Sequence, residues 1–255
     1  MRCVACAVLF CASLPAVADP PAWVTVKGQV TFPADLPLPV PKAIQPAQPV
    51  PLCKGRPLVD ESILVNPKNR GIKNVVVWLR PDDVKNPKAA FAPNEIHPAD
   101  AKRKPADAVI DQPCCQFEPR VLTARVGDTV VVKNAAKIIH NIFWVSGNNG
   151  ELNQNVPAGG EFRFPKVLVE ENAAITFSCT QHPWMKGAAR VFDHPYFAVT
   201  DDDGKFEIKN APAGKYRIVM WHEAVGFKGG REGRFGDPIG IKVGMPDAAA
   251  TWEVK

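Results

Sequence analysis

Apolar and polar residues alternate over several short stretches of the chain, and this is the period of a half-buried β-strand. Residues 23–32, WVTVKGQVTF, place Val24, Val26, Val30 and Phe32 on one face and polar residues on the other. Residues 72–79, IKNVVVWL, form an unbroken apolar run instead. Such a run predicts a strand that is buried on both faces.

A denser series of short strands is predicted after Phe117. The segments VLTARV, TVVVKN, HNIFW, EFRF, AAITFSC and ARVF lie between residues 121 and 192, with a turn at Gly127 and Asp128. VTDDDGKFEI then predicts a hairpin centred on Asp203 and Gly204, and APAGKYRIVMW, IGIKV and TWEVK supply further strands. Many short strands separated by turn residues predict an all-β fold of packed sheets.

Proline strengthens this prediction, because the chain of 255 residues contains 26 prolines. The proline ring removes a backbone donor and clashes with the preceding helical turn, so long helices are disfavoured. Two proline-rich stretches, 33–57 and 81–113, predict surface loops or linkers.

The first 18 residues predict an export signal. Met1 and Arg2 precede a short apolar run, and Ala16, Val17 and Ala18 form an A-x-A cleavage signature. Cleavage after Ala18 would place the protein in the periplasm or cell envelope, with no transmembrane segment in the mature chain. The lysines and arginines are scattered and the net charge is only +5, so nucleic-acid binding is not expected.

Four cysteines would remain after cleavage, at positions 53, 114, 115 and 179. Exported thiols tend to pair, and adjacent cysteines bridge each other only with strain. Cys53 is therefore expected to form a disulfide with Cys114 or Cys115, which leaves one unassigned thiol.

One heptapeptide carries candidate chemistry. Cys179, His182 and Met185 form the pattern C-x-x-H-x-x-M at the end of an apolar strand. A short loop can direct a thiolate, an imidazole and a thioether at one point. Type 1 copper sites need these groups and a second imidazole, which His140 in the strand HNIFW would supply. Zinc also binds thiolate and imidazole but does not favour a thioether, so copper is predicted.

Other metal chemistry fits less well. A multicopper oxidase or nitrite reductase would require further histidine clusters, and a binuclear copper centre would require a second loop cysteine where this chain has Gln181. The triple acid at 201–203 lacks the alternating spacing of a calcium loop and is interpreted as a turn. His194 and His222 could form a second metal site or an acid-base pair, although structural roles are favoured.

Residues 112–192 resemble the cupredoxins, blue copper proteins of the amicyanin and plastocyanin type, through FEPRVLTARVGDTVVVKNAAKIIHN and FSCTQHPWM. The resemblance implies a Greek-key β-sandwich with one type 1 copper bound by His140, Cys179, His182 and Met185. It also implies that Asn141 braces the ligand loop by hydrogen bonding near the thiolate. Redox protein partners would dock near His182 and Trp184.

The outer segments resemble a different module. VKGQVTF, KNVVVWLR and VTDDDGKFEIKNAPAGKYRIVMWHE are similar to the carboxypeptidase regulatory-like, transthyretin-type β-sandwich. The combination is similar to bacterial proteins labelled methylamine utilisation protein. The predicted organisation is a signal peptide (1–18), a cupredoxin domain (112–192), and a regulatory-like sandwich built from 19–111 and 193–255. Two tandem domains are the alternative to this insertion.

The sequence therefore predicts an exported, non-enzymatic copper protein that carries single electrons between redox partners. Two other functions stay open. The same ligands would serve copper storage or delivery, and a cell-surface β-sandwich scaffold could carry an incidental copper domain.

Overall fold

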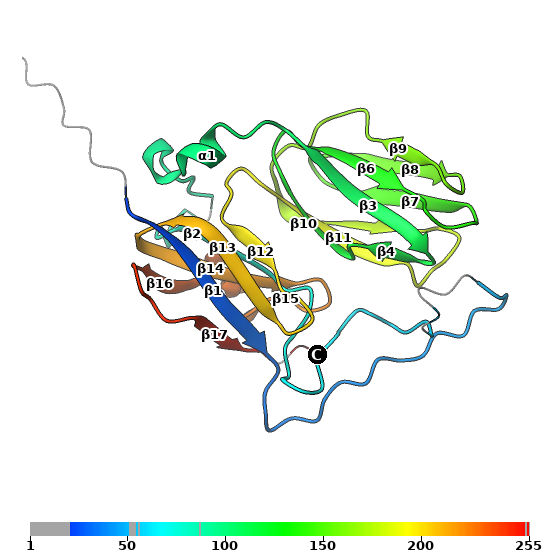
Figure 1. Ribbon diagram of the computed structural model, residues 1–255, viewed down its shortest axis with the longest axis horizontal. Helices are drawn as coiled ribbons and strands as arrows, with labels where there is room; N and C mark the ends of the chain where they lie inside the picture. Colours follow the sequence, from blue (N-terminus) through cyan, green and yellow to red (C-terminus); the bar gives the residue numbers. More distant parts are fainter. Residues whose placement is uncertain (1–20, 51–54, 56, 87, 253, 255) are drawn as a thin grey trace, which may run out of the picture.

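The computed structural model describes residues 21–50, 55, 57–86, 88–252 and 254. Its regular secondary structure is almost entirely β-strand, arranged in two sandwiches (Figure 1). The predicted all-β fold is confirmed. The predicted signal peptide and the predicted disulfide partner Cys53 lie outside the described residues. Within the described part of the chain, no helix is long and apolar enough to span a bilayer.

The first sandwich is built from consecutive strands that form two sheets. One sheet has the order β5-β11-β10-β7-β8 and the other the order β4-β3-β6-β9. Ile110 and Val132 from the second sheet pack with Trp144 and Phe177 from the first in one buried core. The strands are β3 (Asp107–Cys114), β4 (Gln116–Glu118), β5 (Val121–Arg125), β6 (Thr129–Lys133), β7 (His140–Val145), β8 (Glu151–Val156), β9 (Glu161–Arg163), β10 (Glu171–Ser178) and β11 (Lys186–Phe192).

The second sandwich combines strands from both ends of the described chain. A sheet of order β13-β1-β17 packs on one of order β12-β2-β14-β15, in which β16 also pairs with β14. The strands are β1 (Trp23–Thr31), β2 (Val76–Pro81), β12 (Phe197–Val199), β13 (Lys205–Pro212), β14 (Gly214–His222), β15 (Gly226–Phe227), β16 (Asp237–Ile241) and β17 (Ala248–Thr251). The segments before and after β3–β11 thus share sheets, and β3 itself crosses the predicted boundary at residue 112.

The burial of β1 and β2 follows the sequence pattern. In β1, Val26 and Val30 are buried while Thr25 and Lys27 are exposed. In β2, Val77 and Leu79 enter the core of the second sandwich. Val76 points the other way and joins a separate cluster with Val121 and Ala188 of the first sandwich. The prediction of burial on both faces is therefore confirmed, because β2 lies between its own core and the neighbouring sandwich.

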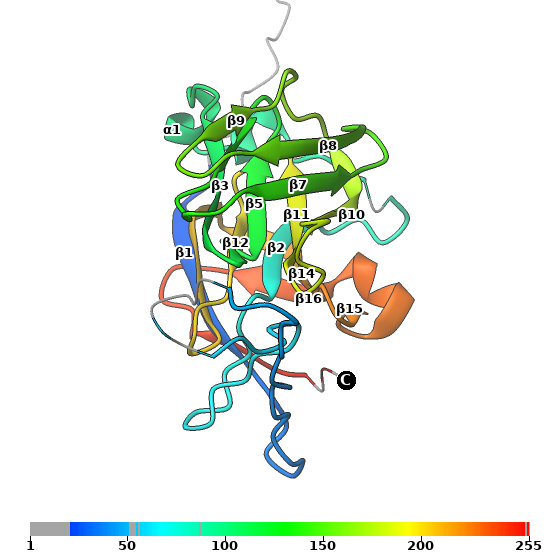
Figure 2. The same ribbon diagram turned by 90° about the vertical axis from the view of Figure 1, so that its right-hand side faces the viewer.

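Figure 2 shows the sandwich of β3–β11 above β2 and β14 of the second sandwich. Arg190 on β11 contacts aromatic rings of the second sandwich and so lies where the two meet. Its side chain projects from β11 and is almost fully buried. The guanidinium carbon lies 4.9 Å from the ring centroid of Trp78, 4.8 Å from that of Trp221 and 5.3 Å from that of Phe227. These three rings, all from the second sandwich, are called the Arg190 cage below. The guanidinium also donates to the Asn172 carbonyl at 2.7 Å.

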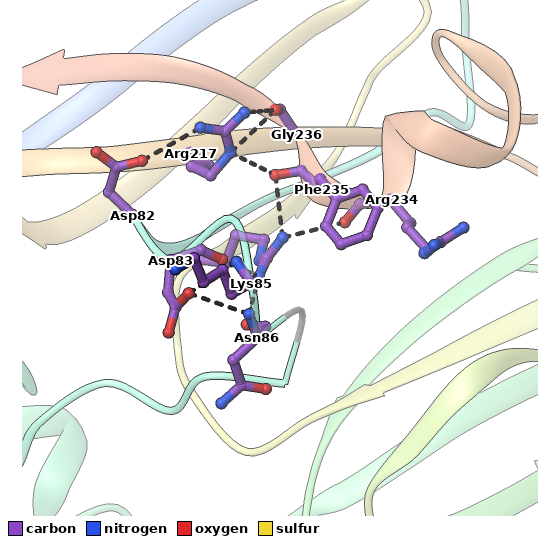
Figure 3. Close-up of polar contacts among 9 residues, drawn as sticks. Asp82, Asp83, Lys85, Asn86, Arg217, Arg234, Phe235 and Gly236 are labelled. Carbon is purple, nitrogen blue, oxygen red and sulfur yellow. Dashed lines mark hydrogen bonds and ion pairs between the residues drawn. The ribbon is translucent and has the colours of Figure 1, made fainter.

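Two further arginines fix the loops at one end of the second sandwich (Figure 3). Arg217 donates through Nε to the carbonyl of Phe235 at 2.6 Å and through Nη2 to that of Gly236 at 2.6 Å. Arg80 donates to the carbonyls of Phe235 at 3.0 Å and Asn86 at 2.7 Å. These bonds hold the 3-10 helix η3 (Gly230–Phe235) against the loop after β2.

Three features differ from the sequence-based predictions. The stretch 81–113, predicted to be a loop, contains the 3-10 helix η2 (Pro93–Glu95), the helix α1 (Pro98–Ala101) and most of β3. β3 escaped prediction because its buried positions include the small Ala108 and the polar Gln112. The polar edge strand β8 was also missed. The predicted hairpin at Asp203 and Gly204 is a tight turn, but its flanking strands enter different sheets, β12 beside β2 and β13 beside β1.

Candidate metal centre

The loop between β10 and β11 is closed by backbone hydrogen bonds. The amide of Cys179 donates to the carbonyl of Met185 at 3.0 Å, and the amide of Met185 donates to the carbonyl of His182 at 2.8 Å. The amide of His182 donates to the Cys179 carbonyl at 3.3 Å. Both sulfur-containing side chains of the loop are buried, and His182 is half-buried. The heptapeptide is therefore a compact turn with its sulfur donors directed away from solvent.

His140 reaches the same point from the start of β7, a neighbour of β10 in the sheet. Its Nδ1 lies 3.2 Å from Nδ1 of His182, and the Sγ of Cys179 lies 3.6 Å from that same His182 nitrogen. His182 thus lies in contact with both His140 and Cys179. Met185 is buried at the end of the same loop.

Both imidazoles are held in their neutral form by their surroundings. Burial, aided by the neighbouring His182, lowers the pKa of His140 to about 4. Burial also lowers the pKa of His182. A neutral imidazole keeps a free lone pair for a metal ion, so no proton has to leave these rings at neutral pH.

Asn141 connects the first histidine strand to the loop. Its Oδ1 accepts a hydrogen bond from the amide of Thr180 at 3.3 Å. Its Nδ2 donates to Oδ1 of Asn153 on β8 at 2.6 Å, and its backbone carbonyl accepts from Nε2 of Gln112 at 2.9 Å. The residue after Cys179 is therefore tied to the sheet through one buried amide side chain.

Comparison with known proteins finds a relative of part of the chain. The chain is 30% identical over 98 residues to amicyanin from Paracoccus denitrificans, and the match spans 38% of this chain and 75% of amicyanin. The chain belongs to the amicyanin family. No protein family model matches it.

Solved structures similar to part of this amicyanin-family chain include cupredoxins and a copper-containing nitrite reductase. A purple cupredoxin from Nitrosopumilus maritimus is 26% identical, covering 34% of this chain and all of its own, with a TM-score of 0.28. The Cu(I) form of an amicyanin variant is 27% identical, covering 39% of this chain and 95% of its own, with a TM-score of 0.29. A copper-containing nitrite reductase from Thermus scotoductus is 22% identical over 35% of this chain and 23% of its own, with a TM-score of 0.30.

The donors that lie near one another here fit a copper ion. The imidazole nitrogens of His140 and His182 and the thiol of Cys179 combine borderline and soft ligands, which suit copper better than a hard cation. His140 is fully buried, and its Nε2 has no hydrogen-bond partner among the described residues, while its Nδ1 faces His182. The two Nδ1 atoms lie at hydrogen-bonding distance, and in the tautomers that leave both lone pairs free the same two nitrogens could bind one metal ion.

A second thiol, which the sequence analysis did not assign to the site, lies beside the same two histidines. Cys115 is fully buried, and its Sγ and the ring nitrogens of His140 and His182 all lie within 4.8 Å of one another. Burial, aided by nearby Cys179, raises the pKa of the Cys115 thiol to about 11. Cys115 is free, whereas Cys114 is disulfide-bonded. The sequence held one sign of this role. The expected disulfide of Cys53 with Cys114 or Cys115 left one thiol without an assignment.

The other two candidate histidines lie outside this centre. His194 accepts a hydrogen bond at Nδ1 from the amide of Tyr196 at 3.1 Å, and its ring packs on Phe91 with centroids 5.0 Å apart. His222 accepts from the amide of Ala224 at 3.3 Å. Neither belongs to a metal-sized cluster within the described residues. These contacts support the structural roles favoured from the sequence.

Proposed function

We propose that this amicyanin-family protein binds one type 1 copper and carries single electrons in the periplasm or cell envelope. The observation that carries the proposal is the convergence of Nδ1 of His140, Nδ1 of His182 and Sγ of Cys179, with distances of 3.2 and 3.6 Å from the His182 nitrogen. Copper bound there would supply a one-electron change between Cu(I) and Cu(II).

The chain's own residues would hold the ligands still during that change. His140 is anchored on a strand, the loop is closed by its backbone hydrogen bonds, and Asn141 ties Thr180 to β7 and β8. A preformed ligand frame limits rearrangement when the charge of the site changes, which favours rapid electron exchange over chemistry on a substrate. We therefore assign the protein a carrier role rather than an enzymatic one.

His182 is the proposed point of electron entry and exit. It is half-buried while His140 is fully buried, so it provides the shorter path to solvent. The Trp184 ring lies 5.3 Å from the His182 ring, and exposed Pro183 lies between them in the chain. This small apolar surface suits a redox protein partner.

We also propose that the two sandwiches are separate domains, with the copper-binding one inserted into the regulatory-like one. The pairing of β1 with both β13 and β17 supports insertion over a tandem arrangement.

The decisive experiment uses the chain from Asp19 onward, loaded with Cu(II), and records visible absorption and electron paramagnetic resonance. Because thiolate-to-copper charge transfer produces an intense band, the parent should be strongly coloured and Cys179→Ala should weaken or lose the band. Ser178→Ala, which changes the adjacent residue but no proposed donor, should retain it in full. A colourless parent, or a band of unchanged position and intensity in Cys179→Ala, would refute the proposal.

A further inference from the structure

Cys115 lies at the junction between β3 and β4, a part of the sandwich remote in sequence from the ligand loop. Its side chain is fully buried. The indole Nε1 of Trp184 donates to the Cys115 carbonyl at 3.1 Å, and this bond joins the junction to the loop that carries Cys179 and His182. The position of Cys115 is therefore fixed relative to the proposed ligands.

The surroundings of its sulfur are those of a metal donor. Sγ of Cys115 and the ring nitrogens of His140 and His182 fit within 4.8 Å of one another. Since zinc–sulfur and zinc–nitrogen bonds are roughly 2.3 and 2.0 Å long, an ion of similar size could contact all three atoms after small movements. Cys115 belongs to the apolar core of the first sandwich, but the two nearby imidazole nitrogens give its sulfur polar neighbours that an ordinary core cysteine lacks.

Cys115 also keeps its thiol where its neighbour does not. Cys114 is engaged in a disulfide, while Cys115 and Cys179 are both free. Both free thiols of the described residues thus lie near the histidine pair. Cys115 belongs to the 4.8 Å cluster, and Cys179 contacts His182 at 3.6 Å.

We propose that Cys115 is a second thiolate ligand, so that the centre binds its metal through two thiolates and two imidazoles. This inference rests on the proposed copper function and changes the composition of the site. Each thiol would lose its S–H proton to solvent as its sulfur–metal bond forms, so no oxidant or reductant is required. Two thiolates add two negative charges to the site and increase its preference for soft ions.

Cadmium ion is a suitable first probe, because it binds thiolates and cannot oxidise them. The wild-type chain from Asp19 should show an ultraviolet thiolate-to-cadmium band. Cys115→Ser and Cys179→Ser should each show about half of that intensity, because each variant keeps one of two sulfurs. Ser178→Ala serves as the control and should show the full band.

A second measurement does not depend on any variant folding. X-ray absorption at the copper edge of the wild-type protein loaded with Cu(I) should find two sulfur atoms at short distance. Circular dichroism of each metal-free variant shows whether it is folded, and Cys115→Ala replaces Cys115→Ser if the serine variant is not.

The outcomes separate the two proposals. One short copper–sulfur distance in the wild type, with a full cadmium band in Cys115→Ser, would overturn the role of Cys115 and leave the copper function standing. Absence of any thiolate–metal signal in the wild type would overturn both. Two short copper–sulfur distances and halved bands support the second ligand.

Discussion

Asn141 shows how a single side chain can control the ligand loop. Its side-chain oxygen accepts a hydrogen bond from the Thr180 amide and its side-chain nitrogen donates to Asn153, so it links the ligand loop to β8. Replacement by Ala would leave the Thr180 amide without this partner. Each lost hydrogen bond of this kind costs about 1 kcal/mol.

We predict that Asn141→Ala lowers the free energy of unfolding by about 1 to 3 kcal/mol and speeds the loss of Cu(I) to a chelator. Urea unfolding and the rate of copper transfer would measure the two effects. Asn155→Ala is the matched control, because it removes only the longer contact of 3.4 Å to Asn141 from an exposed position. Equal effects in both variants would contradict the assigned role.

The residues of the candidate site differ in how far the sequence alone predicts them. Cys179, His182 and Met185 lie within seven positions, so one loop must bring them near each other whatever the rest of the chain does. Assigning His140 to the site required the assumption that its strand lies beside the strand that ends at the ligand loop. Cys115 is linked to the site only by tertiary packing, so its adjacency to Cys114 favoured an interpretation as a disulfide candidate.

At the scale of elements, the turn between β12 and β13 illustrates a backbone requirement. Gly204 has φ of +72°, and a Cβ built there would lie 2.3 Å from the Val30 carbonyl oxygen. The Asp201 side chain accepts hydrogen bonds from the amides of Asp203 and Lys205 and so holds this turn closed. The turn therefore needs glycine for both its conformation and its close contact with β1.

We predict that Gly204→Ala lowers the free energy of unfolding by about 2 to 4 kcal/mol, as a left-handed residue and a backbone clash combine. Gly150→Ala is the control, since Gly150 has φ of +76° but no atom within 4 Å of the added carbon. It should cost only about 1 to 2 kcal/mol. Urea unfolding measures both variants. If Gly204→Ala and Gly150→Ala lowered the free energy of unfolding equally, the clash with Val30 would be relieved by local movement.

Sequence periodicity predicted elements well where burial was one-sided and the inward residues were large. β1 satisfies both conditions. β3 fails because Ala108 and Gln112 occupy inward positions, and β8 fails because an exposed edge strand has little need for apolar residues. The turn at Gly204 was predicted, but the pairing of its flanking strands depends on sheet topology, which local pattern does not contain.

At the scale of the whole molecule, the Arg190 cage couples the two sandwiches. The charge and planarity of arginine allow it to interact with three rings and a carbonyl at once, which lysine cannot do.

We predict that Arg190→Lys lowers the free energy of unfolding by about 2 kcal/mol. Arg163→Lys, at an exposed ion pair with Asp107, should change it by less than about 0.5 kcal/mol. Urea unfolding measures both, and equal losses would argue against the cage.

Acid should destabilise the protein through His222, which is almost fully buried. Burial lowers its pKa to about 4, although the Lys73 carbonyl opposes the shift, whereas a histidine in the unfolded chain titrates near 6.5. Between these values the unfolded chain binds a proton that the folded protein does not. The free energy of unfolding therefore falls as the pH drops from about 6.5 to about 4, and the full loss persists below that.

We predict that His222→Gln removes about 2 kcal/mol of the stability difference between pH 7 and pH 5. Urea unfolding of the metal-free protein at both pH values would test this. The parent should lose more stability than the variant over that interval. A variant with the parent's full pH dependence would show that His222 is protonated without cost in the folded protein.

The strand order has a mechanical consequence. The first sandwich is joined to the second at both of its ends, through the residues between β2 and β3 and through those between β11 and β12. A domain joined by a single linker can rotate relative to its neighbour. The first sandwich is joined by two linkers and by the Arg190 cage, so its rotation relative to the second sandwich is restricted. The loop from Cys179 to Met185 thus keeps a constant orientation on the second sandwich. A partner protein that binds to the second sandwich would therefore be held at the same distance from His182 each time it binds.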